Sequence, residues 1–376
     1  MRISRVTTYR IRIPFRSVFA HALQRRGVTE AVIVVIESDS GEVGIGEVLP
    51  RPYLTGETLE SVSRNIRALA QRWLGRTFED RDEVVHALYE ELRLSGRALA
   101  TFAGWELAIL DMAGKVFRFA AGDLLGPISG PELIAGAVID FGVPTYNLEK
   151  HCRLLRLAGR RHIKVKVGLD DDLPRLSLVQ EVFGADHPLR LDANGAWTAD
   201  HAIAMLRQMA RFNIRSVEQP VPARDLIGMR KVREGTGVAV VADESLCSLE
   251  DGQCLAAAQA ADVFNIRIAK CGGFLASLRL VKLANEAGLS CQLGTLVGET
   301  GILSRAGEIF GCRVKGFEFL EGKLQNNRLL VQDILEVRPV EASTHTGLGI
   351  TIASDHLNKW TVVPPIVYPA RQGAIA

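Results

Sequence analysis

The sequence predicts an α/β protein built on a parallel (β/α)8 barrel of the TIM type, with a smaller α+β unit beside it. Two patterns predict this fold. The first hundred residues carry apolar residues at a period of two, and the middle of the chain carries eight β-branched runs, each followed by a helical stretch. We expect an N-terminal capping domain at 1–125, the barrel at 126–332, and a C-terminal segment at 333–376 that returns to the capping domain. An open doubly wound sheet is the competing arrangement.

Composition narrows the class of protein. The chain has 376 residues, 47% apolar and 23% charged, which suffices for a large core and excludes intrinsic disorder. A net charge of +2 gives no reason to expect nucleic acid or a membrane surface as partner, so a small molecule is expected. Apolar runs such as Ala31–Ile36 are far shorter than a membrane span, and no signal peptide is recognisable, so we expect a cytoplasmic protein. The six cysteines form no Cys-x-x-Cys pair and are expected to be reduced packing residues.

In the capping domain, three period-two runs predict an antiparallel sheet, at Ile3–Ile11, Ala31–Ile36 and Val43–Glu47. Helical spacing follows at Thr58–Leu74 and Arg81–Leu94. The more apolar stretch Ala98–Lys115 predicts a helix that is buried against the sheet.

In the barrel, each strand is predicted as a short β-branched run that ends in polar residues. The eight runs are Ala137–Phe141, Ile163–Val167, Leu189–Asn194, Ser216–Pro220, Val238–Ser245, Val263–Lys270, Leu289–Gly294 and Gly316–Glu321. The carboxyl ends of these strands are where a barrel of this kind places its active site.

Charged residues recur at the ends of successive predicted strands. They are Lys164 and Lys166, Asp192 with Asn194, Glu218, Asp243 with Glu244, and Lys270, spaced 25 to 27 residues apart from Lys166 onward. Residues in phase at the same height of neighbouring strands converge on one point above the barrel.

Three carboxylates on adjacent strands, with no His or Cys in phase, predict a site for Mg²⁺, or for Mn²⁺. Such an ion takes the oxygens of a substrate carboxylate and stabilises the enediolate that forms when the adjacent carbon loses a proton. Asn194 is expected to orient a ligand or a metal-bound oxygen.

Two lysines are placed to exchange that proton. Lys166 and Lys270 lie four strands apart and would flank one carbon, which is the geometry of a racemase or epimerase, and the neighbouring charge of Lys164 is expected to help Lys166 act as a base. Asn265, Arg267 and Lys270 cannot all face inward on a regular strand. Either a bulge precedes Lys270, which its Gly-Gly turn favours, or Arg267 faces elsewhere.

The ordered set of motifs closely resembles the enolase superfamily, and within it the muconate lactonizing enzyme subgroup. The motifs are Lys164-Val-Lys166, Leu191-Asp-Ala-Asn-Gly195, Val217-Glu-Gln-Pro220, Ala242-Asp-Glu-Ser245 and Ile268-Ala-Lys-Cys-Gly-Gly273, joined in the capping domain by Gly46-Glu47 and Pro52-Tyr-Leu-Thr-Gly-Glu57. The resemblance implies Asp192, Glu218 and Asp243 as Mg²⁺ ligands. It implies Lys166 and Lys270 as the acid/base pair, with Lys164 tuning Lys166 and contacting the substrate carboxylate.

Substrate contacts are predicted from the same resemblance. Glu299 corresponds to a family position that contacts substrate, although a carboxylate at a helix start is an equal explanation. Arg25 and Arg26 lie in the loop that would close over the barrel, where they could meet an anionic group, and His21 is expected to pack within that loop. Dipeptide epimerases carry Asp-x-Asp at the eighth strand, whereas this chain has Leu320-Glu-Gly-Lys323, so Glu321 alone would bind a cation.

The leading functional hypothesis is a Mg²⁺-dependent racemase or epimerase of N-substituted amino acids that acts on a small carboxylate substrate. A muconate-type cycloisomerase or a dehydratase of the o-succinylbenzoate-synthase kind would use the same site with one lysine. A third hypothesis is a barrel that has lost activity and serves as a scaffold protein. The complete set of lysines and carboxylates disfavours it. We also expect a homo-oligomer.

Overall fold

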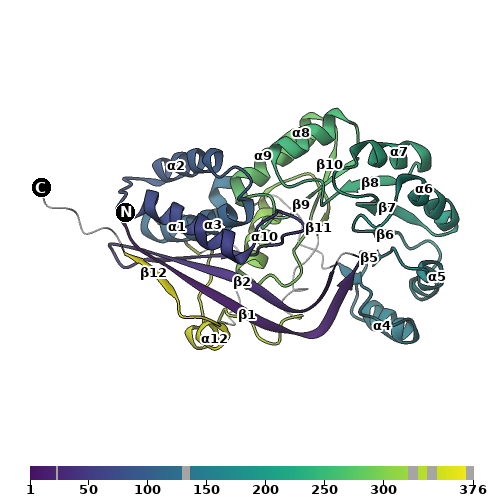
Figure 1. The fold of residues 1–376 in the computed structure, drawn as a ribbon, viewed down its shortest axis with the longest axis horizontal. Helices are drawn as coiled ribbons and strands as arrows, with labels where there is room; N and C mark the ends of the chain where they lie inside the picture. The colour runs from purple at the N-terminus through teal and green to yellow at the C-terminus, as the bar shows by residue number, and fades with distance from the viewer. Residues whose placement is uncertain (23, 129–135, 321–328, 337–344, 370–376) are drawn as a thin grey trace, which may run out of the picture.

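The computed structural model describes residues 1–22, 24–128, 136–320, 329–336 and 345–369 of the chain. The strands of these residues form two sheets, one of four strands in the order β12-β1-β2-β3 and one of eight in the order β11 to β4. Figure 1 shows the small sheet and its helices lying against one side of the larger unit. No helix among the residues described is both long and apolar enough to cross a membrane.

The four-stranded sheet is antiparallel. It consists of β1 (Ile3–His21), β2 (Gln24–Ser38), β3 (Val43–Val48) and β12 (Ile366–Pro369). The hairpin of β1 and β2 runs well beyond the predicted strands, with an irregularity in register between Pro14 and Phe19. The last strand comes from the far end of the chain, because β12 pairs with Arg5–Thr8 of β1 (Figure 1).

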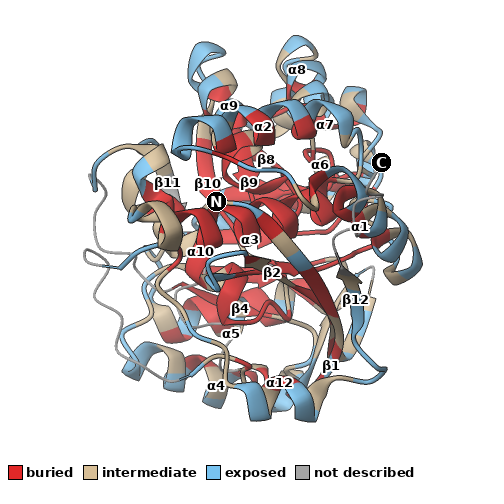
Figure 2. Ribbon diagram, turned by 90° about the vertical axis from the view of Figure 1, so that its left-hand side faces the viewer, coloured by how far each residue is buried: buried red, intermediate tan, exposed pale blue. Residues whose placement is uncertain are grey.

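Three helices cover this sheet, namely α1 (Leu59–Trp73), α2 (Arg81–Leu94) and α3 (Leu99–Phe117). Helix α3 is buried along nearly its whole length, as predicted, and lies in the interior of the molecule in Figure 2. Glycines allow its close approach to the sheet. A Cβ atom on Gly46 of β3 would lie 1.9 Å from the carbonyl oxygen of Gly104 in α3, so only glycine fits there.

The eight-stranded sheet is parallel, and its neighbours follow chain order. Its elements alternate as β4 (Ala137–Ile139), α4 (Thr145–Leu157), β5 (Ile163–Lys166), α5 (Asp172–Phe183), β6 (Leu189–Asp192), α6 (Ala199–Gln208), β7 (Ile214–Glu218), α7 (Leu226–Thr236), β8 (Ala239–Ala242), α8 (Leu249–Ala257), β9 (Val263–Ile266), α9 (Gly273–Glu286), β10 (Ser290–Leu293), α10 (Gly301–Arg313) and β11 (Phe317–Leu320). Short helical segments η1 (Ala121–Leu125), η2 (Met209–Arg211) and α12 (Ser354–Trp360) complete the described fold. Because the strand order never reverses, a doubly wound sheet is excluded.

Several strands end earlier than predicted. The prediction that one strand runs from Val263 to Lys270 is wrong, because β9 ends at Ile266. A turn follows, in which the Lys270 amide donates to the Arg267 carbonyl at 3.0 Å and the Cys271 amide donates to the same oxygen at 2.9 Å. The predicted bulge before Lys270 is therefore replaced by a turn, and both Arg267 and Lys270 reach the ends of the strands.

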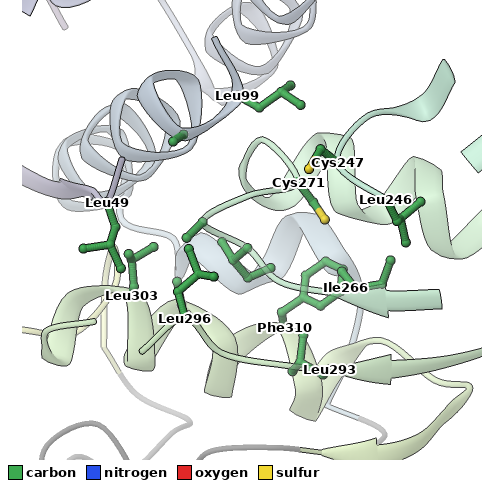
Figure 3. Packing of buried hydrophobic residues seen from close by; sticks show 14 of the residues in the cluster. Leu49, Leu99, Leu246, Cys247, Ile266, Cys271, Leu293, Leu296, Leu303 and Phe310 are labelled. Carbon is green, nitrogen blue, oxygen red and sulfur yellow. The ribbon is translucent and has the colours of Figure 1, made fainter. Parts of the chain in front are cut away.

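Two buried carboxylates join the small sheet and its helices to the larger unit. Glu47 of β3 accepts hydrogen bonds from the Thr300 amide and hydroxyl at the start of α10, and Glu106 of α3 accepts from the Phe274 and Leu275 amides at the start of α9. Each carboxylate satisfies amides that a helix start leaves unpaired. Apolar packing adds to these links, with Leu49 beside Leu303 in Figure 3.

Candidate active site

The two lysines of β5 point into a cluster of carboxylates at the ends of the neighbouring strands. Lys166 Nζ donates to Asp192 Oδ2 at 2.6 Å and to Asn194 Oδ1 at 2.7 Å. Lys164 Nζ lies 3.3 Å from Glu218 Oε2 and 3.4 Å from Asp192 Oδ2. Lys164 is thus shared between two carboxylates, while Lys166 is held by one carboxylate and one amide.

Two of the three predicted metal ligands lie at one level of the sheet, and the third, Asp243, lies two residues beyond the partner of Glu218 in β8. In the strand register Lys166 pairs with Asp192, and Asp192 pairs with Glu218. Asp243 follows directly after β8, and Asn265 links it to Glu218 by donating to both carboxylates at 3.1 and 3.0 Å. The structure therefore brings together the residues that the spacing predicted to converge.

Positive charge balances these buried carboxylates. Burial alone would raise the pKa of Asp192, but the charges of Lys166 and Lys164 outweigh it, and the pKa is lowered below its ordinary value. Burial also opposes ionisation of Asp243, and the charges of Arg267 and Lys270 lower the pKa of that carboxyl. Both carboxylates remain ionised at neutral pH.

The two cations after β9 are placed differently. Arg267 Nη2 lies 3.0 Å from Glu218 Oε1 and 2.8 Å from Asp243 Oδ2, and Arg267 lines the cavity above the strands. Lys270 is fully buried and is not among the residues that line the cavity, and its Nζ donates to the Asp243 and Leu246 carbonyls at 2.5 and 2.6 Å. Burial lowers the pKa of Lys270. The negative charge of Asp243, together with smaller effects of Cys271 and Cys247, outweighs burial, so the pKa is raised above its ordinary value.

A cavity of about 310 Å³ opens at this end of the sheet. Its polar floor is formed by Lys164, Lys166, Asn194, Glu244 and Arg267. The tip of the β1–β2 hairpin and the segment after β3 form its other wall, through Phe19, His21 and Tyr53. A substrate in this cavity would contact both the parallel sheet and the small sheet.

The remaining predicted substrate contacts are spread more widely. Arg25 is exposed, and Arg26 lies over the ring of Tyr53 at 5.7 Å from its centroid, so it adjoins a cavity residue. Glu299 directly precedes Thr300, the N-cap of α10, and it is buried and accepts from the Leu296 amide at 2.6 Å. Burial raises the pKa of Glu299 to about 8. Glu321 lies outside the described residues.

Two further cavity residues were not assigned a role from the sequence. Glu244 accepts from Asn194 Nδ2 at 2.9 Å, and burial with the charges of Asp243 and Asp192 raises its pKa to about 8. His21 is kept neutral, because burial and the charge of Lys166 lower its pKa to about 3. The adjacency of Glu244 to Asp243 was visible in the sequence, whereas the place of His21 depends on the length of the hairpin.

The chemistry of the donor set fits a hard divalent cation. Asp192, Glu218 and Asp243 supply only carboxylate oxygens from adjacent strands, which are the ligands that such an ion prefers. As the side chains are placed, no three acidic, histidine or cysteine residues among those described are gathered closely enough to share an ion. Binding would therefore require the carboxylates to turn from Lys164 and Arg267 towards the ion.

Comparison with known proteins defines the class. Residues 147–356, more than half of the chain, match the family described as "Enolase C-terminal domain-like", the C-terminal domain of the mandelate racemase and muconate lactonizing enzymes. The chain belongs to this family, and the resemblance that the motifs predicted is confirmed. Its homologues are racemases, epimerases and cycloisomerases, and the chain is an isomerase-type enzyme of the enolase superfamily.

Three relatives illustrate the similarity. A hydrophobic dipeptide epimerase of Enterococcus faecalis is 31% identical over 80% of this chain and 84% of its own length, and its structure with Mg and the dipeptide L-Leu-L-Tyr superposes with a TM-score of 0.85. An N-succinyl-L-Arg/Lys racemase of Bacillus cereus is 29% identical over 98% of this chain and all of its own, with a TM-score of 0.89. A muconate lactonizing enzyme of Pseudomonas fluorescens, complexed with muconolactone, is 26% identical over 96% of this chain and 99% of its own, with a TM-score of 0.87.

Proposed function

We propose that this chain is a Mg²⁺-dependent enzyme that removes the proton from the carbon next to a substrate carboxylate. The observation that carries the proposal is the position of Lys166. Lys166 lines the floor of the cavity, and its Nζ lies 2.6 Å from Asp192 and is held from a second side by Asn194. A base fixed at the edge of a carboxylate cluster is what formation of an enediolate requires.

Asp192, Glu218 and Asp243 would hold the divalent cation, which in the bound state supplies positive charge to the substrate carboxylate and stabilises the developing negative charge. The structures of two dipeptide epimerases complexed with Mg support the choice of metal. We further propose that the eight-stranded sheet closes as a complete barrel, with the capping domain and barrel meeting near residue 125.

The residues that line the cavity have different roles in the proposed reaction. Neutral Lys166 takes the proton to its Nζ, and the electron pair of the C–H bond passes into the enediolate. Lys164, shared between Asp192 and Glu218, faces the same cavity and is placed to bind the carboxylate of the substrate. Phe19, His21 and Tyr53 exclude water from the opposite side of the cavity.

An N-substituted amino acid is the proposed substrate class, with racemisation or epimerisation as the leading reaction. Relatives that act on dipeptides and on N-succinyl amino acids support this choice. A muconate-type cycloisomerase, or a dehydratase of the o-succinylbenzoate-synthase kind, is the second candidate. The contacts of Lys270 favour it, since these reactions need one lysine at the cavity.

The test is solvent exchange. The protein with Mg²⁺ is incubated in deuterated buffer with N-succinyl amino acids, N-acetyl amino acids and dipeptides, and loss of the α-proton is followed by NMR. Lys166→Met should lose exchange by at least about a hundredfold, as expected for removal of a general base, whereas the exposed Lys282→Met should match the parent protein. Exchange that persists in Lys166→Met would contradict the role of this lysine.

A further inference from the structure

Another cavity lies at the opposite end of the parallel sheet from the candidate active site. Its volume is about 610 Å³, and its lining residues stand at or next to the amino ends of β5, β6 and β7. In the strand register Ile163 pairs with Leu189, and Leu189 pairs with Ile214, so these three ends lie at one level. None of the described residues that line it also lines the active-site cavity. A ligand bound here would therefore not compete with the substrate for contacts.

The lining of this cavity is strongly basic. Of its seven described residues, Ile163 and Pro188 are apolar and the other five are basic. The five are Arg161, His162, His187, Arg190 and Arg215. An adjoining cavity of about 220 Å³ shares Arg215 and contains a carboxylate, Asp262, but Arg233 Nε binds that carboxylate at 2.6 Å. The larger cavity, which we call the basic cavity, thus concentrates positive charge and attracts anions.

One cation of the basic cavity is built into the interior of the sheet. Arg190 is only 4% exposed, and its Nη1 donates to Oε1 of Gln292 in β10 at 3.2 Å. A guanidinium is rarely buried to this extent, because its desolvation costs free energy that acceptors must offset. Arg161 and Arg215 are exposed, so their side chains can turn towards a ligand. The site therefore combines one ordered guanidinium with two adjustable ones.

The two histidines of the basic cavity are kept neutral by their surroundings. Burial and the charge of Arg190 lower the pKa of His162, and burial and His162 lower the pKa of His187. The His187 ring is hydrogen-bonded to the Arg161 backbone, and its Nε2 is buried without a hydrogen-bond partner among the described residues. An anion beside Nε2 would favour the protonated ring, which donates from both nitrogens.

We infer that the basic cavity binds the phosphate group of a small phosphorylated compound. A phosphate monoester carries a charge of about −1.5 to −2 at pH 7 and three acceptor oxygens. Three oxygens suit guanidinium groups that reach the ligand from the ends of three strands, because each guanidinium can donate two parallel hydrogen bonds. The volume is within the range of small-molecule sites, so an organic group fits beside Ile163 and Pro188. This inference goes beyond the proposed function and does not depend on it.

Calorimetry with glycerol 3-phosphate and with inorganic phosphate tests the inference, using the protein with Mg²⁺ at constant ionic strength. Both probes should bind, and glycerol 3-phosphate more tightly. Arg161→Gln and Arg215→Gln each remove a charged donor at an exposed position and should weaken binding at least tenfold. Arg279→Gln, exposed on α9, is the matched control and should bind like the parent. Parent-like affinity in both site variants, or equal weakening in the control, would overturn the inference.

Two further measurements locate the ligand and define its class. Lys166→Met should bind glycerol 3-phosphate like the parent, because Lys166 lines only the active-site cavity. Loss of binding in this variant would place the phosphate in the active site and overturn the inference, whereas the exchange experiment tests the proposed function separately. Succinate at equal concentration should not displace glycerol 3-phosphate. Displacement by succinate, or tighter binding of inorganic phosphate, would overturn the assignment to a phosphorylated compound.

Discussion

Opposite charges alternate through the cluster at the ends of β5 to β9. Asp192 lies between Lys164 and Lys166, and Asp243 lies between Arg267 and Lys270. In a buried cluster of this kind, removing one charge leaves its partner unpaired, which costs several kcal/mol. The effect of each substitution therefore depends on which neighbour it leaves alone.

Metal binding gives a prediction for single residues. Addition of Mg²⁺ should raise the melting temperature of the parent protein, because the ion binds the folded state, and chelation should abolish turnover. Asp192→Asn and Asp243→Asn each remove one of three proposed oxygen charges and should weaken Mg²⁺ binding at least tenfold, measured by calorimetry. Asp200→Asn, whose side chain is exposed, is the control. Unchanged Mg²⁺ affinity in both site variants would show that the ion binds elsewhere.

At the scale of secondary-structure elements, the carboxylate of Glu106 at the start of helix α9 makes the stability of the folded protein depend on pH. Burial raises its pKa from 4.5 to about 8, so the folded state holds this proton more tightly than the unfolded state does. The stabilisation is complete below the unfolded value of 4.5 and is lost as pH rises through about 8. Between these values the slope reaches at most about 1.4 kcal/mol per pH unit.

Glu106→Gln should therefore flatten the pH dependence. Its melting temperature, measured by circular dichroism, should fall less between pH 5 and 8 than that of the parent, because one titrating group is absent. The variant loses one hydrogen-bond acceptor for the amides of α9, which costs about 1 kcal/mol in the free energy of unfolding. It should therefore melt at a lower temperature than the parent at pH 5. Glu286→Gln, at an exposed position, should keep the parent slope. A parent-like slope in Glu106→Gln would contradict the raised pKa.

The contact of β3 with α3 gives a second prediction for elements. Gly46→Ala would place a methyl group 1.9 Å from the Gly104 carbonyl oxygen, so the helix must move from the sheet. We expect a loss of roughly 2 kcal/mol or more in the free energy of unfolding, measured with urea. Gly27→Ala in β2, where nothing lies within 4 Å, should change it by less than about 0.5 kcal/mol. Equal stability of the two variants would refute the close approach.

The sequence predicted which strands exist better than where they end. All eight runs form strands of the parallel sheet, because β-branched periodicity reports burial. Periodicity does not report a turn such as Arg267–Lys270, where hydrogen bonds to the Arg267 carbonyl reverse the direction of the chain. That is why Lys166 and Asp192, on regular strands, lie where the spacing predicted, while Lys270 does not line the cavity.

At the scale of the whole molecule, the cavity combines segments that are distant in the sequence. His21 and Tyr53 face Lys166 from the other side of the cavity, and no local pattern links positions so far apart. The placement of His21 follows from the long hairpin, whose Ala20 amide donates to Asp140 Oδ1 at 3.2 Å after β4. The floor of the site was therefore predictable from the strand spacing, and the resemblance predicted that the hairpin loop closes over it, whereas the position of Tyr53 was not predicted.

For the whole molecule we predict assembly into a homo-oligomer. Large apolar side chains are exposed on α4, where Tyr146 and Leu157 are 85% and 84% accessible. Together with the prevalence of symmetric enzymes, this supports a homo-oligomer. Light scattering at micromolar concentration should give a multiple of 41.0 kDa. A mass of one chain would refute it, and Tyr146→Lys with Leu157→Lys should lower the mass if α4 forms the interface.

Pairing of β12 with β1 also fixes when the small sheet can be finished during synthesis. Residues 5–8 of β1 leave the ribosome early, yet their partners at 366–369 emerge only after the whole parallel sheet has been translated. Until then one edge of β1 presents unpaired amides and carbonyls to other nascent chains. Chaperones that cover strand edges would therefore matter most for this protein in the last moments of translation, and a premature stop before Ile366 would leave that edge permanently open.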